Sequence, residues 1–297
     1  MTIKAIVCDM DGTLLTADHQ IPPMTLKKLV ELQEKGIKLI LASGRSYKRL
    51  LPDALKLKMD QYNGILIDVN GTSIYYVKNS ERKRISILDR VNIKEINEHF
   101  SRFNVELQYS QDDTIYTYLP DPIYQLKVNI RGEMKLPDDY PWTGGMYSWL
   151  SDTRDGYPNQ FLIRDLNDAP EYCNKMSIVQ EPIYIDFVYQ SIVNDPIFEK
   201  YEFVFSDERK IEVTRKGTTK GKALDLILEE YHIGPDEVLI FGDSENDISM
   251  FEGKKYTVAM KDALPKAKSH ANYITDSNNN EGVYKMIIKL EKEGLFG

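Results

Sequence analysis

Two aspartates near the start of the chain could act on a phosphoryl group or hold a metal ion. Asp9 and Asp11 follow an apolar run at residues 5–8, and Gly12 comes directly after them. Residues two apart on an extended chain point the same way, and glycine allows a sharp turn. Parallel strands of α/β proteins carry their chemistry at the carboxyl ends. We interpret Asp9 as a nucleophile and Asp11 as its acid/base partner, with a magnesium ion between them; a simple polar turn is the alternative.

A third carboxylate, Asp243, follows a second buried strand expected at residues 237–241. A carboxylate attacks phosphorus only when its own charge and that of the phosphate are neutralised. Mg²⁺ does this with oxygen ligands, so Asp9, Asp11 and Asp243 are candidates to converge on one ion. Ser244 with Asp247 also matches a helix capping box. The two interpretations are compatible, because a cap can fix the loop that presents Asp243.

Two further segments carry groups suited to a phosphate. Ser43, Gly44 and Arg45 follow a strand expected at residues 37–42, and a hydroxyl with backbone N–H groups there suits a phosphate oxygen, although it suits any polar loop as well. Lys220 lies in the first turn of an expected helix, where the helix dipole disfavours a cation by roughly 0.3–1 kcal/mol. A bound anion would explain it; a solvated lysine is the alternative. Gly221 would let backbone approach a ligand closely.

Alternating strands and helices on either side of a long insertion predict a parallel sheet. We expect strands at residues 4–8, 37–42, 65–69, 237–241, 256–259 and 272–275, and helices at 24–35, 47–57, 220–231 and 283–292. The sequence between them, rich in tyrosine and proline, predicts an α+β insertion. We place a discontinuous core at residues 1–84 and 210–297 and the insertion at 85–209.

Two further segments carry predictions of their own. Residues 73–87 predict a hairpin followed by a basic, solvated stretch at 78–84. An aromatic cluster is either a lid that faces a substrate or packing within the insertion. Its members are Tyr140, Trp142, Tyr147 and Trp149.

The composition limits the partners and the setting. The net charge is −8 over 297 residues, which argues against broad binding to nucleic acid or to an anionic membrane. The first apolar run is too short for a secretory or spanning segment. Cys8 and Cys173 provide no disulfide framework, so we expect a reduced, cytoplasmic setting.

Taken in order, these motifs resemble those of the haloacid dehalogenase superfamily. They are Asp9-Met10-Asp11-Gly12-Thr13, Ser43-Gly44-Arg45, Lys220 and Gly242-Asp243-x-x-Asn246-Asp247. The insertion resembles a type C2 cap in its position and size. Asn70-Gly71 and Thr219-Lys220-Gly221-x-Ala223-Leu224 resemble the Cof-type phosphatases of subclass IIB. The resemblance covers roughly residues 3–75 and 211–290, and it implies a Rossmann-like α/β core with an inserted cap.

The resemblance also implies roles for individual residues. Asp9 would form an aspartyl-phosphate and bind Mg²⁺. Asp11 would protonate the leaving alcohol and then activate water, while its backbone carbonyl touches the metal, and Asp243 would complete the protein ligands. Other groups would hold the phosphoryl oxygens: the side chains of Ser43, Lys220 and Asn246 and the backbone at Met10 and Gly44. Asp247 and Arg45 would contact these residues from the outside.

We therefore expect a cytoplasmic, Mg²⁺-dependent phosphatase that acts on a small phosphorylated metabolite, with a sugar phosphate favoured, as a monomer or homodimer. The cap would close over the site and select the leaving group. A phosphosugar mutase is the alternative within the same chemistry. A non-catalytic protein that binds a phosphorylated metabolite and regulates a partner is the alternative from another class.

Overall fold

The chain divides into two compact units in the computed structural model, which describes residues 2–145 and 148–296. The larger unit comprises Met1–Ile85 and Thr218–Gly297, and the smaller comprises Ser86–Gly217. The first boundary lies one residue after the predicted one. The second was predicted at residue 210, which is too early. Residues 210–217 belong to the smaller unit because the strand they contain pairs within its sheet.

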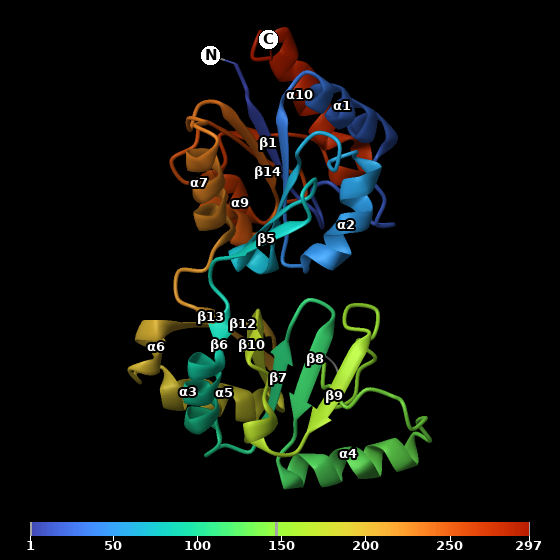
Figure 1. Ribbon diagram of the computed structural model, residues 1–297, viewed down its shortest axis with the longest axis vertical. Helices are drawn as coiled ribbons and strands as arrows, with labels where there is room; N and C mark the ends of the chain where they lie inside the picture. Colours follow the sequence, from blue (N-terminus) through green and yellow to red (C-terminus); the bar gives the residue numbers. More distant parts are fainter. Residues whose placement is uncertain (1, 146–147, 297) are drawn as a thin grey trace. The chain divides into compact units, whose positions relative to one another are not determined.

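An eight-stranded sheet forms the centre of the larger unit, in the order β16-β15-β14-β1-β2-β3-β4-β5 (Figure 1). Its parallel strands are β1 (Ala5–Asp9), β2 (Lys38–Ala42), β3 (Ile65–Asp68), β14 (Val238–Gly242), β15 (Tyr256–Ala259) and β16 (Tyr273–Ile274). The antiparallel strands β4 (Ser73–Tyr76) and β5 (Glu81–Arg84) extend one edge. The predicted parallel-sheet core is confirmed.

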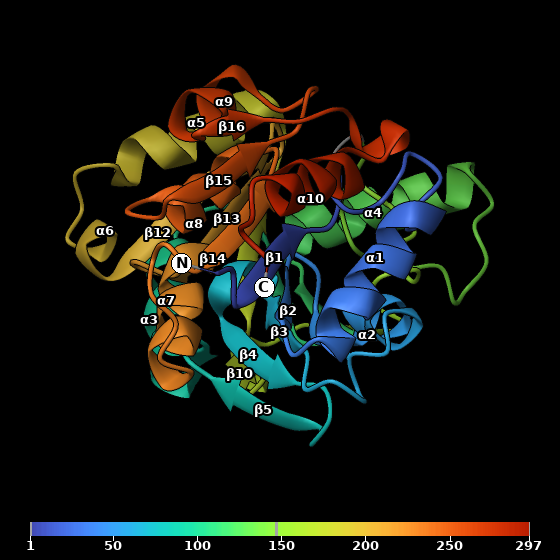
Figure 2. The ribbon, with the colours of Figure 1, turned by 90° about the horizontal axis from the view of Figure 1, so that it is seen from above.

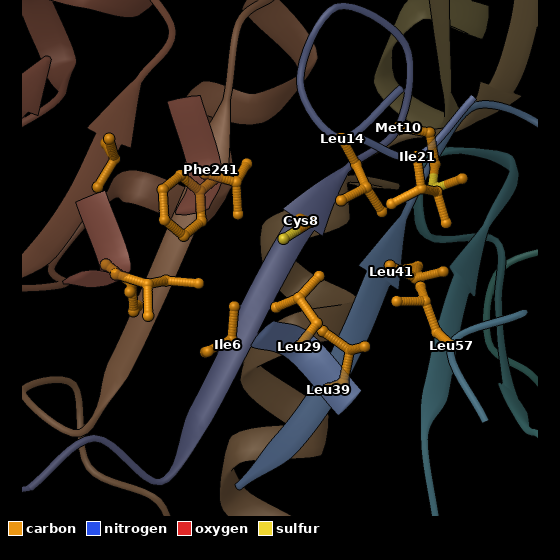
Figure 3. Packing of buried hydrophobic residues seen from close by; sticks show 14 of the residues in the cluster. Ile6, Cys8, Met10, Leu14, Ile21, Leu29, Leu39, Leu41, Leu57 and Phe241 are labelled. Atoms are coloured by element: carbon orange, nitrogen blue, oxygen red, sulfur yellow. The ribbon is translucent and has the colours of Figure 1, made fainter. Parts of the chain in front are cut away.

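Helices cover both faces of this sheet, because successive residues of each buried strand point to opposite sides. Ile6 and Cys8 of β1 pack on the face covered by α1 (Pro23–Glu34), α2 (Tyr47–Lys56), α9 (Pro265–His270) and α10 (Gly282–Lys292) (Figure 3). Ala5 and Val7 pack on the opposite face, covered by α7 (Lys220–Glu230) and α8 (Ile248–Phe251). Figure 2 shows α1 and α10 together on one side of the sheet and α7 on the other. Burial on both faces fixes the strand ends where the polar residues emerge.

The smaller unit is an α+β domain with its own core. Its six-stranded sheet has the order β12-β13-β11-β7-β8-β9. These strands are β7 (Glu106–Ser110), β8 (Thr114–Tyr118), β9 (Asn159–Ile163), β11 (Lys175–Val179), β12 (Tyr201–Asp207) and β13 (Lys210–Arg215). A two-stranded sheet pairs β6 (Leu88–Asp89) with β10 (Tyr172–Cys173). The helices are α3 (Arg90–Phe100), α4 (Asp121–Glu133), α5 (Pro182–Ile192) and α6 (Ile197–Lys200).

The two tryptophans of the aromatic cluster pack inside the smaller unit. The ring of Trp142 stacks on Tyr124 at 5.1 Å, and the guanidinium of Arg131 lies 4.3 Å from its centroid. Trp149 lies under the guanidinium of Arg209 at 4.8 Å. These contacts support the packing interpretation for both side chains, and the lid stays a prediction. Tyr147 lies outside the described residues.

A fully buried ion pair ties the loop that carries Trp142 to this unit. The ammonium of Lys127, on α4, contacts the carboxylate of Glu106, on β7, and donates to the carbonyl oxygen of Trp142. Glu106 also accepts hydrogen bonds from the Gly144 N–H at 2.8 Å and from Gln108 at 2.7 Å. Burial lowers the pKa of Lys127, and the carboxylate of Glu106 opposes that shift.

In the part of the chain that the structure describes, no helix is long and apolar enough to span a membrane.

We expect Lys127→Met to lower the free energy of unfolding of the smaller unit by about 3–5 kcal/mol, because Glu106 would remain buried without its cation. Both tryptophans of the chain, Trp142 and Trp149, lie in this unit, so urea unfolding followed by tryptophan fluorescence reports on it. The double variant Lys127→Met/Glu106→Leu removes both charges and should lose less. A single variant as stable as the wild type would contradict the account.

Candidate active site

Polar residues gather where four neighbouring strands of the large sheet end. Asp9 is the last residue of β1, Asp243 follows β14, Ser43 follows β2, and Asn70 lies just beyond β3. These strands are adjacent and parallel, in the order β14-β1-β2-β3. Their carboxyl ends therefore meet at one edge of the sheet, which is where α/β folds bind ligands.

Lys220 is the central cation of this edge. It is the first residue of α7 and only 1% exposed. Its Nζ atom lies 2.6 Å from Oδ1 of Asp9 and 2.7 Å from Oδ1 of Asp247. Although burial alone would lower the pKa of Lys220, the two carboxylates raise it well above its usual value. The solvated-lysine alternative is wrong, and the ammonium is a fixed positive charge beside Asp9.

Three carboxylates converge beside this ammonium. One oxygen each from Asp9, Asp243 and Asp247 lies within 4.8 Å of the others. Burial raises the pKa of Asp9 to about 8, against the opposing effect of Lys220, and burial also raises the pKa of Asp243. Three carboxylates around one ammonium leave an excess of negative charge when all are ionised. Clustered carboxylate oxygens are the donors that a hard divalent cation such as Mg²⁺ prefers, so this donor set fits the ion.

Two hydroxyl groups orient Asp243, one from the loop after β1 and one from the loop that carries Asp243 itself. Its Oδ1 accepts a hydrogen bond from the hydroxyl of Thr13 at 2.9 Å, and its Oδ2 accepts one from the hydroxyl of Ser244 at 3.0 Å. Gly12 has φ of +80°, and a Cβ atom there would lie 2.6 Å from Oδ2 of Asp243. Glycine at position 12 therefore serves both the turn and the close approach of Asp243. The sequence placed Thr13 in a motif but predicted no contact for it.

Asp247 has two structural roles at once. Its Oδ2 accepts the Ser244 N–H at 3.0 Å, which is one half of the predicted capping box. The same oxygen also accepts the Asp243 N–H at 2.9 Å. Its Oδ1 faces Lys220. The predicted capping box is confirmed, and the cap fixes the loop that carries Asp243.

The carboxylate of Asp11 lies apart from this cluster. Arg45 holds it from two sides: Nε donates to Oδ2 at 2.8 Å, and Nη2 contacts Oδ1. His19 Nδ1 lies 3.7 Å from the same Oδ1, and the Asp11 side chain is 51% exposed. The structure thus separates the two aspartates into a buried one at the cation cluster and an accessible one paired with arginine. The expected metal contact of Asp11 was its backbone carbonyl, and this stays a prediction.

Three of the predicted phosphate-binding residues, Ser43, Gly44 and Asn246, lie beside Asn70. The hydroxyl oxygen of buried Ser43 accepts the Arg45 N–H at 3.1 Å. Asn246 donates to Oδ1 of Asn70 at 3.0 Å, and a Cβ atom on Gly44 would lie 3.4 Å from that same oxygen. Asn70 was not predicted as a site residue, although its pairing with Gly71 in the sequence was the available signal.

Two further predicted positions differ in what they can contribute. The side chain of Met10 is buried in the core (Figure 3), so only its backbone is available to a ligand. A Cβ atom on Gly221 would lie 2.0 Å from the carbonyl oxygen of Ser249. Gly221 therefore permits α7 to pack against α8, and the expectation that it admits a ligand is wrong.

Comparison with known proteins agrees with this geometry. A family model described as haloacid dehalogenase-like hydrolase matches residues 6–287. A haloacid dehalogenase-like hydrolase from Bacteroides thetaiotaomicron has the same fold with a TM-score of 0.75, at 25% identity over 97% of this chain and 100% of that one. The subclass IIB sugar phosphatase BT4131 gives a TM-score of 0.67 at 23% identity, covering 97% and 99%.

A curated relative extends the comparison to a named activity. The pyridoxal phosphate phosphatase YbhA of Escherichia coli is 25% identical over 293 residues, which cover 97% of this chain and 98% of that protein. At this coverage the match extends over both units. The chain therefore belongs to the haloacid dehalogenase-like hydrolase family, and it is a phosphatase of that family.

Proposed function

We propose that the protein is a Mg²⁺-dependent phosphatase that hydrolyses a small phosphorylated metabolite through an aspartyl-phosphate on Asp9. The observation that carries the proposal is the position of Asp9, buried at the tip of β1 between the ammonium of Lys220 and the carboxylate of Asp243. A cation on either side would neutralise the charge that otherwise keeps a carboxylate away from a phosphate.

In the first step, an oxygen of Asp9 attacks phosphorus and the bond from phosphorus to the leaving oxygen breaks. Asp11 gives its proton to that oxygen, and the alcohol leaves. In the second step, Asp11 takes a proton from water, the water oxygen attacks phosphorus, and the acyl–phosphate bond breaks to release inorganic phosphate and restore Asp9. Splitting the reaction in this way replaces one difficult step with two easier ones.

The remaining groups hold the phosphoryl oxygens and the metal. Lys220, Ser43 and Asn246 would donate to these oxygens, with the backbone N–H groups of Met10 and Gly44. Asp9 and Asp243 would hold Mg²⁺ with the carbonyl of Asp11, and Asp247 would keep Lys220 and the Asp243 loop in place. When bound, the ion would offset the negative charge that Asp9 and the phosphate bring together.

The substrate we favour is a sugar phosphate. The similarity in fold to a sugar phosphatase supports this class. Two curated relatives are named for the dephosphorylation of pyridoxal phosphate and of a phosphoribitylamino uracil, so small phosphorylated metabolites are the wider class to screen. A mutase would return the phosphoryl group to the sugar as an isomer, and a binding protein would retain the metabolite unchanged. Measuring free phosphate together with the recovered organic product separates the three.

Asp9→Asn should lower the rate of phosphate release by more than about 10⁴-fold, because the amide cannot serve as the nucleophile. A malachite-green assay on a panel of sugar phosphates measures this. Asp262→Asn is the matched control: it changes an exposed aspartate of the same unit and should keep wild-type turnover. Wild-type release from Asp9→Asn would overturn the mechanism.

Removal of divalent cations should abolish turnover, because the excess negative charge at Asp9, Asp243 and Asp247 would then repel the phosphate. Activity in EDTA should return when excess Mg²⁺ is added. Mg²⁺ should also raise the melting temperature of the wild type, and of Asp243→Asn much less, since ligands that bind the folded state stabilise it. Full activity in EDTA would contradict the assignment of the metal.

Arg45→Met should lower kcat/KM by about 10–10²-fold, because the carboxylate of Asp11 would lose the contacts that fix its orientation. Arg45→Lys keeps the charge without the two-point contact and should fall between Arg45→Met and the wild type. Steady-state kinetics on the best substrate of the panel gives both values. If Arg45→Met turns over as fast as the wild type, the pairing has no part in catalysis.

A further inference from the structure

A buried ion pair lies beside the residues proposed to bind phosphate, and neither of its members belongs to that set. Asp68 ends β3 and is completely buried, and Arg82 of β5 exposes only 9% of its side chain. Nη2 of Arg82 lies 2.6 Å from Oδ2 of Asp68, and its Nε donates to the hydroxyl oxygen of Ser73 at 3.0 Å. The Ser73 hydroxyl donates to Oδ1 of Asp68. The prediction of a solvated stretch at residues 78–84 is therefore wrong for Arg82.

The same carboxylate fixes the start of α2. Oδ2 of Asp68 accepts the N–H of Tyr47, the first residue of that helix, at 3.1 Å. Ser46 is the N-cap residue, yet its side chain makes no capping hydrogen bond, so Asp68 supplies the acceptor from a neighbouring strand. The guanidinium of Arg82 also lies 4.7 Å from the ring centroid of Tyr47. Residues 43–46 lead directly into α2, so the pair sets where that turn ends.

A strained turn follows Asp68 directly. Val69, Asn70 and Gly71 have φ values of 44°, 55° and 95° in succession. A β-branched residue at positive φ is a costly outlier that persists only where its surroundings hold it. The Val69 N–H donates to the carbonyl oxygen of Arg45 at 3.0 Å, and the Asn70 N–H donates to that of Ser43 at 2.9 Å. The strained turn is thus bonded to the loop that carries the phosphate-binding hydroxyl.

The far end of this turn lies against the helix that presents Lys220. A Cβ atom on Gly71 would lie 2.2 Å from the carbonyl oxygen of Thr219. Thr219 caps α7, because its side-chain hydroxyl oxygen accepts a hydrogen bond from the Lys222 N–H. The Asn70 side chain contacts Asn246 as described above. This short strained segment therefore contacts groups proposed to bind phosphate at the ends of two other strands, β2 and β14, and it packs against the start of α7.

We propose that Asp68 is a positioning residue: its pair with Arg82 holds the turn Val69–Gly71, and thereby Ser43, Gly44 and Asn246, in the arrangement that binds the phosphoryl group. The inference rests on the proposed function. A buried ion pair adds little net stability compared with well-packed apolar side chains, so a role in orientation explains its presence better than a role in stability. Its loss should weaken phosphate binding even in protein that stays folded.

The test is calorimetric titration of inorganic phosphate, with Mg²⁺ present, into Asp68→Asn and Arg82→Gln. Each should bind phosphate about 10-fold or more weakly than the wild type, and KM should rise with it, because misplaced donors lose affinity steeply. The double variant should lose no more phosphate affinity than the single variant that binds phosphate less tightly, since both residues act through the same turn.

Glu291→Gln is the matched control in the same unit. It breaks the partly buried pair between Glu291 and Lys28, which are 2.6 Å apart, and touches no residue of the turn. It should lower the melting temperature and leave phosphate affinity unchanged.

Wild-type phosphate affinity in folded Asp68→Asn and Arg82→Gln would overturn the proposal, and so would an equal loss in Glu291→Gln. If Asp68→Asn does not fold, Arg82→Gln alone decides the question. A wild-type chain that binds no phosphate, or an active Asp9→Asn variant, would instead overturn the proposed function.

Discussion

The ammonium of Lys220 is the interaction on which the site depends. It is buried at the start of α7 and bonds both Asp9 and Asp247, so it joins the end of β1 to the loop after β14. Without it, the buried carboxylates of Asp9 and Asp247 and the half-buried one of Asp243 would face one another without its counter-charge, and burial disfavours such charge strongly. With Lys220 in place, the three carboxylates, when all are ionised, still carry two negative charges in excess, and one divalent cation would balance them. The geometry thus prepares the place where a phosphate and a metal would meet.

The same strand builds the core and presents the proposed nucleophile. Alternate residues of β1 pack on opposite faces of the sheet, and the strand then ends in Asp9 and a glycine turn. Gly12 admits Asp243, and Gly71 admits the start of α7. At both places a side chain would push apart segments that are distant in sequence. Packing of the core and placement of the site are therefore one constraint.

Local patterns in the sequence predicted the parts whose signals are local. Apolar runs that end in polar residues predicted the parallel strands. The unfavourable position of Lys220 indicated a bound anion, and the structure shows the carboxylates of Asp9 and Asp247 as its partners; the bound phosphate stays a prediction. Arg82 was missed because it lies in a run of charged residues, and only strand pairing brings it to Asp68. The boundary at residue 210 failed for the same reason, since β13 finds its partners far away in the chain. Gly221 was misread because nothing near it in sequence reveals Ser249.

The central claim is that Asp9 forms a covalent bond to phosphorus, and trapping that bond tests it most directly. Wild-type protein is mixed with a sugar phosphate that it hydrolyses, and the reaction is quenched in acid within the first turnover. The protein is then reduced with borohydride, and its peptides are analysed by mass spectrometry. We predict that residue 9 is recovered as homoserine, the reduction product of an aspartyl-phosphate, and that no such product forms without substrate. Rapid phosphate release with residue 9 recovered only as aspartate would contradict the account.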